Sequence, residues 1–260
     1  MLDELVAGAL EDAAARRAER DLARVEADAL APDPAVDAVA ALAPGSRVKI
    51  IAEVKARQPL AGRAGPRSPT RRPSRVSYQT GGASAISVLT EGRRFGGSLA
   101  DLESVRAAVE LPVLRKDFIA EPYQVFEARA AGADLVLLIV AALDDRTLAE
   151  LHTLIGELGM TALVETHSAA EVDRALDIGA TVVGVNARDL TTFELDRDLF
   201  GSLADRIPSG VIRIAESAVL DPSDVTHYRE AGADVVLIGE ALVRGENPVE
   251  TLEQFLAAGA

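Results

Sequence analysis

The chain has 260 residues, a formal net charge of −14, and a composition that is 48% hydrophobic but only 3% aromatic. This length suits one α/β barrel better than two ordinary domains, and the scarcity of aromatic residues argues against a β-sandwich. The net negative charge argues against a nucleic-acid partner, because no basic field gathers phosphates.

The residue inventory narrows the chemistry further. The chain has no cysteine, which excludes disulfides and thiolate catalysis, and its three histidines show no metal-ligand spacing. The start, Met1 to Glu4, is acidic where a signal peptide is basic, and the longest apolar run, Leu135 to Leu143, is too short to span a bilayer. We therefore expect a cytoplasmic protein with no metal and no membrane partner.

The first segments of the chain read as helices. Residues Leu2 to Leu30 predict a charged amphipathic helix, and Val36 to Leu42 predict a shorter apolar one. An ordinary barrel needs neither, so we predict an N-terminal helical extension over residues 1–45. It is expected to form a lid or plug on a barrel of residues 46–260, within a single domain.

A repeated junction gives the main architectural signal. In each copy, Gly-Ala and one further residue lead directly into a run rich in Leu and β-branched residues. Glycine suits the left-handed position that ends a helix, and the run that follows suits a strand buried on both faces. The copies begin at Gly82, Gly132, Gly179 and Gly232.

The junctions recur about every fifty residues, roughly two βα units, and a further strand candidate lies in each interval. The eight predicted strands are Val48–Val54, Ala85–Leu89, Pro112–Leu114, Leu135–Val140, Ala162–Glu165, Val182–Asn186, Val211–Glu216 and Val235–Gly239. Such regular alternation predicts an α/β fold, a closed (β/α)8 TIM barrel. A doubly wound open sheet is the alternative.

One segment differs in composition from the rest of the chain. Residues 56–76 hold six arginines and four prolines but no acid, so the rest of the chain carries about −20. The prolines disfavour a helix, and only the last residues before Gly81 are expected to be helical.

Catalytic groups of a barrel lie at the carboxyl ends of its strands. Five predicted strands bring polar residues to that end, and these residues are Glu53, Lys55, Lys116, Asp117, Glu165, Asn186, Arg188, Glu216 and Ser217. The loops after the last two strands are the expected phosphate site, and Ser217, Gly239 and Glu240 fall there.

Lysine is rare in this chain, occurring only at positions 49, 55 and 116. A partly desolvated lysine can have its pKa lowered into a range useful for acid catalysis, which arginine cannot. We expect this of Lys55 and Lys116, whereas Lys49 lies at the opposite barrel end. The alternative is that the two lysines are ordinary ion-pair partners of Glu53, Glu165 and Glu216. Glu165 and Glu216 are each candidates for a general base. The alternative is that each is a solvated carboxylate at a strand tip.

Over essentially its full length, the sequence resembles the indole-3-glycerol phosphate synthase family of tryptophan biosynthesis. The stretches that carry the resemblance are Ile51 to Lys55, Ser87 to Glu91, Arg94 to Leu99, Val113 to Phe118, Leu137 to Leu143, Gly184 to Leu190 and Ala215 to Ser217. The resemblance implies a lyase of aromatic amino acid biosynthesis, a decarboxylase that needs no cofactor. It would convert 1-(2-carboxyphenylamino)-1-deoxyribulose 5-phosphate to indole-3-glycerol phosphate, carbon dioxide and water. We expect a monomer or weak homo-oligomer that binds this small phosphorylated substrate.

The resemblance also implies roles for residues. Lys116 corresponds to the general acid toward the substrate carbonyl, and Glu165 to the base for the loss of water. Lys55 would contact the substrate carboxylate, with the division of the acid role between it and Lys116 left open, and Glu53 and Asn186 would hold the network. The apolar walls around the ring would be Phe95, Phe118, Leu137 and Leu190, and the polar rim Arg188, Glu216 and Ser217.

Two positions depart from the family pattern. After the first lysine the family has Lys-x-x-Ser-Pro-Ser, whereas Gln58-Pro59-Leu60 stands here. The family's Glu-Ser-Gly after strand 7 ends here in Ala218, which adds a methyl group beside the expected phosphate site.

The first departure spans residues 56 to about 77, which motivates the hypothesis of two compensating frame shifts in a high-GC gene. A clean, unshifted read of these codons would refute it. The altered loop leaves open an alternative function, a catalytically impaired or non-catalytic barrel that still binds ligand. A sibling barrel such as phosphoribosylanthranilate isomerase is disfavoured, because it lacks the long extension and the lysine pair.

Overall fold

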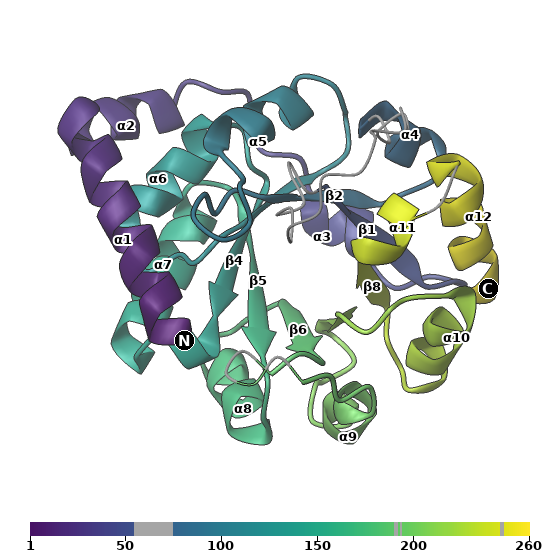
Figure 1. The fold of residues 1–260 in the computed structure, drawn as a ribbon. Coiled ribbons are helices and arrows are strands. Elements are labelled where there is room, and N and C mark those ends of the chain that lie inside the picture. Colours follow the sequence, from purple (N-terminus) through teal and green to yellow (C-terminus); the bar gives the residue numbers. More distant parts are fainter. Residues whose placement is uncertain (55–74, 190–191, 193, 245–246) are drawn as a thin grey trace, which may run out of the picture.

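The computed structural model describes residues 1–54, 75–189, 192, 194–244 and 247–260. Parallel strands pair in chain order from β1 to β8, and β8 pairs with β1 to close a barrel (Figure 1). The strands are β1 Lys49–Val54, β2 Ala85–Leu89, β3 Val113–Lys116, β4 Leu135–Ile139, β5 Thr161–Thr166, β6 Val182–Asn186, β7 Ile212–Glu216 and β8 Val235–Ile238. The predicted (β/α)8 TIM barrel is confirmed, and the open sheet is excluded.

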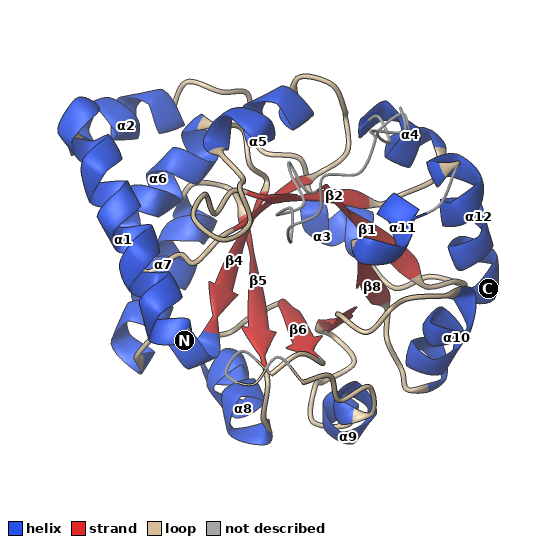
Figure 2. Cartoon of the chain, in the orientation of Figure 1, coloured by secondary structure: helices blue, strands red, loops and turns tan. Residues whose placement is uncertain are grey.

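Helices surround the strands on the outside (Figure 2). After β1 they are α4 Arg75–Thr80, α5 Leu99–Arg106, α6 Pro122–Ala130, α7 Asp145–Glu157, α8 Ala169–Asp177, α9 Leu199–Ala204, α10 Pro222–Glu230, α11 Glu240–Arg244 and α12 Pro248–Ala258, with a 3-10 turn η1 at Val140–Ala142. Helix α4 lies just before Gly81, where the sequence predicts a helix, and the rest of the arginine-rich segment lies outside the described residues.

All four predicted junction glycines have left-handed backbones. Their φ angles are +91° at Gly82, +88° at Gly132, +78° at Gly179 and +92° at Gly232. A residue with a side chain is strained in this region, so glycine lets each helix stop and the chain turn directly into the next strand.

The N-terminal extension differs from its prediction mainly in its first helix. The helix expected over Leu2 to Leu30 is two helices, α1 Leu2–Glu19 and α2 Leu22–Ala29. Arg20 adopts an extended backbone between them, and the Asp21 carboxylate accepts a hydrogen bond from the backbone N–H of Arg24 at 2.9 Å. This side-chain cap starts the second helix, because it satisfies an N–H that has no partner within the helix.

The extension contacts both ends of the barrel. Helix α3, Ala38–Leu42, places Ala38 and Leu42 in the apolar cluster of the barrel interior, and Lys49 at the start of β1 donates to the Ala41 carbonyl at 2.9 Å. At the other end, Leu5 of α1 packs on the same cluster and reaches the carboxyl ends of the strands. Helix α3 is therefore the plug, and α1 borders the opposite mouth.

Candidate active site

Strand alternation determines which side chains enter the barrel. Ile51, Leu114, Leu163 and Ile214 belong to the interior apolar cluster, whereas their neighbours Ile50 and Val164 pack on the helices outside. Counting two residues onward from each interior residue gives the last inward positions of β1, β3, β5 and β7, because successive side chains point to opposite faces. Those positions are Glu53, Lys116, Glu165 and Glu216. The ionisable cluster thus follows from strand parity in a closed barrel.

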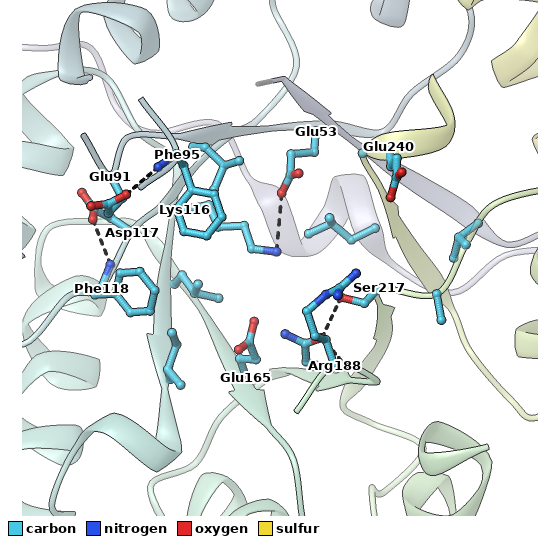
Figure 3. Close-up of a pocket in the computed structure, with 18 of the residues that line it drawn as sticks. Glu53, Glu91, Phe95, Lys116, Asp117, Phe118, Glu165, Arg188, Ser217 and Glu240 are labelled. Atoms are coloured by element: carbon cyan, nitrogen blue, oxygen red, sulfur yellow. Dashed lines mark hydrogen bonds and ion pairs between the residues drawn. The ribbon is translucent and has the colours of Figure 1, made fainter. Parts of the chain in front are cut away.

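A cavity of about 420 Å³ opens at this end, and Figure 3 shows Lys116, Glu53, Glu165 and Arg188 around it. Most of the predicted site residues line it together. They are Glu53, Phe95, Lys116, Phe118, Leu137, Glu165, Asn186, Arg188, Ser217, Ala218, Gly239 and Glu240. Lys55 and Leu190 lie outside the described residues.

Lys116 is the centre of a group of acids. Its Nζ lies 3.1 Å from Oε2 of Glu216 and 3.6 Å from Oε2 of Glu53. Burial would lower the pKa of Lys116, but the carboxylates of Glu216, Glu53 and Glu165 outweigh it and raise that pKa well above its usual value. The expected lowering is wrong for Lys116, because three acids from three other strands converge on one ammonium group.

Glu216 lies beneath the cavity and is not among the residues that line it. Its side chain is fully buried, and burial raises its pKa to about 8; Lys116 opposes this shift, and the carboxylate of Glu165 adds to it. Gly184 on the neighbouring strand makes this placement possible, since a Cβ there would lie 2.2 Å from Oε1 of Glu216. Glu216 therefore belongs to the floor of the site, where it contacts Lys116.

Glu165 is 1% exposed at the end of β5 and faces the cavity. Its Oε1 lies 3.4 Å from Nε2 of His167, a residue that the sequence did not single out as functional. A carboxylate that faces a cavity can act as a general base toward a substrate bound there.

The polar rim is organised by Asn186. Its side-chain oxygen accepts hydrogen bonds from the Ser217 hydroxyl at 2.7 Å and from the backbone N–H of Arg188 at 3.0 Å. These contacts join the loops after β6 and β7, so Arg188 and Ser217 are held on the same side of the cavity.

Two buried acids fix the aromatic wall. The Glu91 carboxylate accepts backbone hydrogen bonds from Arg94 and Phe95, each at 2.8 Å, and the Asp117 carboxylate accepts one from Phe118 at 2.9 Å. Asp117 is itself held by the guanidinium of Arg115 at 3.0 Å. The loops that carry the two phenyl rings are therefore tied to charged groups rather than free to move apart.

The expected phosphate end has an unusual backbone. Ser217 and Ala218 have φ angles of +66° and +53°, the two left-handed non-glycine residues in the described part of the chain. After the neighbouring strand β8, Gly239 approaches Glu53 so closely that a Cβ there would lie 2.5 Å from the Glu53 carboxylate. The departure from glycine at position 218 therefore falls where glycine is the residue best suited to the backbone.

Several lining residues were not anticipated. Ile139 and Leu237 lie at inward positions of β4 and β8, and strand parity identifies them once the register is known. Leu5 comes from α1, and no local sequence pattern marks it as part of the site. Within the described residues, no group of His, Asp and Glu is arranged to hold a metal ion, and no helix is long and apolar enough to cross a membrane.

Solved structures of similar shape share little sequence with the chain. A 3-hexulose-6-phosphate synthase aligns with a TM-score of 0.60 and 19% identity, covering 82% of this chain and all of its own. A thiamine phosphate pyrophosphorylase from Pyrococcus furiosus aligns with a TM-score of 0.58 and 13% identity, covering 81% of this chain and 94% of its own. These similarities support the barrel fold alone.

Sequence relatives are far closer. An indole-3-glycerol phosphate synthase of Leifsonia xyli subsp. xyli is 68% identical over 255 residues, covering 98% of this chain and 97% of the relative. Those of Beutenbergia cavernae and Mycobacterium ulcerans are each 52% identical, covering all of this chain and 96% and 94% of the relatives. The family model for indole-3-glycerol phosphate synthase matches residues 2–255. These matches agree with the barrel and with the acids that surround Lys116 at its mouth, and they show that this chain belongs to the indole-3-glycerol phosphate synthase family.

Proposed function

We propose that Lys116 and Glu165 carry out the acid and base steps of the family's reaction in this chain. That reaction closes the ring of 1-(2-carboxyphenylamino)-1-deoxyribulose 5-phosphate, with loss of carbon dioxide and water, to give indole-3-glycerol phosphate. The observation that carries the assignment is the position of Lys116 at the cavity wall, 3.1 Å from one carboxylate and 3.6 Å from another.

Lys116 acts as the general acid. Attack of a ring carbon on the substrate carbonyl builds negative charge on the carbonyl oxygen, and a proton donor beside that oxygen lowers the activation barrier of this step. The surrounding acids keep Lys116 protonated in the free enzyme, which is the form that can donate. Glu53 and Glu216 hold the ammonium group in position, and Glu216 acts through Lys116 rather than by touching substrate.

Glu165 acts as the base in the loss of water. It faces the cavity from a different strand, so one proton is delivered and another removed from separate sides of the same space. Asn186 holds Ser217 and Arg188 on the rim. Lys55 is proposed to contact the substrate carboxylate.

The remaining lining residues suit the two ends of the substrate. Phe95, Phe118 and Leu137 offer an apolar wall to the aromatic ring, together with Leu190 from the sequence prediction. The backbone around Ser217, Ala218, Gly239 and Glu240 is proposed to receive the phosphate. We further propose that the chain is cytoplasmic, acts as a monomer or weak homo-oligomer, and binds no nucleic acid.

Fluorescence of the indole product tests the proposal directly. The purified chain is expected to turn over the substrate, and Glu165→Gln is expected to lower kcat by about a hundredfold or more, in the range typical of general acid–base catalysis. Substrate binding without turnover by the unaltered chain would support the non-catalytic alternative. Near-normal turnover by Glu165→Gln would refute the base assignment.

A further inference from the structure

His167 lies two residues beyond Glu165, in the turn between β5 and α8, and the proposed reaction does not use it. Its Nε2 is 3.4 Å from Oε1 of Glu165, and its Nδ1 is 3.3 Å from Oε2 of Glu171. The imidazole therefore bridges a buried carboxylate at the cavity and a second carboxylate in the first turn of α8.

Local structure fixes Glu171 in this arrangement. Its Oε2 accepts a hydrogen bond from the backbone N–H of His167 at 2.9 Å, and its Oε1 accepts one from the Ser168 hydroxyl at 3.1 Å. Ser168 in turn caps α8 by accepting from the backbone N–H of Glu171. The carboxylate that faces Nδ1 is thus held by the same contacts that start the helix.

Exposure rises along the three residues. The exposed fractions of the side chains are 2% for Glu165, 13% for His167 and 17% for Glu171. As a base, Glu165 gains a proton in every turnover and must lose it before the next. Glu216, which also lies close to Glu165, is fully buried and offers no outlet.

We propose that His167 and Glu171 return the proton from Glu165 to solvent. Nε2 of neutral His167 accepts the proton from the Glu165 carboxyl group, which restores the Glu165 carboxylate and leaves an imidazolium. The Glu171 carboxylate stabilises this cation and accepts its Nδ1 proton, which passes from Glu171, the most exposed of the three side chains, to water. Proton exchange of the neutral imidazole with solvent then restores the tautomer whose Nε2 is free to accept. This relay rests on the proposed base role of Glu165 and extends it.

The relay predicts a particular pH dependence. Three carboxylates face His167, namely Glu165 on β5, Glu171 on α8 and Glu216 on β7. Burial lowers the pKa of His167, but Glu171 and then the other two acids outweigh burial and raise it. Since neutral imidazole is the accepting form, kcat should increase with pH through this titration. Glu171→Gln removes the largest raising influence and should move that acidic limb to lower pH.

The decisive measurement compares the first turnover with later ones. In His167→Asn, rapid-mixing fluorescence should show a first turnover at the normal rate, followed by steady-state turnover slowed about tenfold or more, because only the reset of Glu165 is impaired. Added imidazole buffer should restore the later turnovers. His152→Asn on the outer helix α7 is the matched control and should leave both phases unchanged.

Each other outcome opposes the relay. An equal slowing of the first and later turnovers would mean that His167 only positions Glu165. Normal steady-state turnover in His167→Asn, with Glu165→Gln inactive, would refute the relay and keep the base role. Normal turnover in Glu165→Gln would refute both. Thermal unfolding of each variant separates these outcomes from loss of the fold.

Discussion

Replacing Lys116 with Met tests the centre of the proposed site. The substitution keeps an unbranched side chain of similar length but removes the proton donor and the ammonium group that lies 3.1 Å from Glu216. Loss of a general acid typically costs about a hundredfold to ten-thousandfold in rate, equivalent to about 3 to 5 kcal/mol in the activation barrier. We expect kcat to decrease within that range.

The fold should survive this change. Breaking a buried ion pair usually costs about 3 to 5 kcal/mol because a charge is left unpaired. Here the pKa of Glu216 is already raised to about 8, so the carboxyl group takes up a proton near neutral pH instead of remaining charged. The free energy of unfolding should therefore decrease by clearly less than the usual cost, as measured by urea titration.

Two further variants sharpen the test. Lys116→Arg keeps the positive charge but does not release its proton near neutral pH, so it should be nearly as inactive as Lys116→Met. Lys49→Met changes the same residue type at the opposite end of the barrel, where Lys49 donates to the Ala41 carbonyl, and should retain normal kcat. Substantial turnover by a folded Lys116→Met protein would refute the general-acid assignment.

Three other predictions concern the rest of the site. Ala218→Gly should raise the melting temperature by about 2 to 4 °C. Relief of a left-handed alanine gains about 1 to 2 kcal/mol and the added freedom of the unfolded chain returns about 0.4 to 1 kcal/mol, which leaves a net gain of about 1 kcal/mol. A lower melting temperature would contradict the strain at φ +53°. Glu216→Gln should become more stable relative to the unaltered chain as pH increases from about 5 to about 8. In the unaltered chain the Glu216 carboxyl group, with its raised pKa, stays protonated when folded but ionises when unfolded, so the unaltered chain loses stability over this interval. Urea titrations at both pH values check the sign, and an equal change in both proteins would refute it. Replacing Gln58 with Ser together with the family's loop should lower KM for the phosphorylated substrate in steady-state assays, and an unchanged KM would show that this loop does not limit binding.

The fold was largely predictable from local patterns. The bounds of β2 and β6 agree with the sequence prediction, and the junction glycines mark the helix ends before four strands. Strand β3 was placed too early, since it runs from Val113 to Lys116 rather than from Pro112 to Leu114. The charged residues Arg115 and Lys116 concealed its end, because Arg115 pairs with Asp117 while fully buried, a contact that no local pattern reveals.

Most residues of the site could be predicted from the sequence, but the directions of their pKa shifts could not. Strand ends identified Lys116 and Glu165, and strand parity places both inside the barrel. The direction of the Lys116 pKa shift depends on acids from β1, β5 and β7, whose convergence requires the closed barrel. For the same reason, the sequence could not distinguish Glu216 beneath the cavity from Glu53 at its wall. It also could not connect Leu5 with a cavity whose next lining residue along the chain, Glu53, is 48 positions away.

The contacts of Lys116 also bear on how the chain folds. Lys116 meets Glu216 across 100 positions of sequence, and it meets Glu53 on the first strand. Loop closure over such distances is entropically costly, so contacts of this kind form late in folding. A partly folded chain in which β7 and β8 have not yet joined β1 lacks the acid that fixes the lysine. Recovery of turnover during refolding would therefore report the final closure of the barrel, whereas circular dichroism would report the earlier gain of helices.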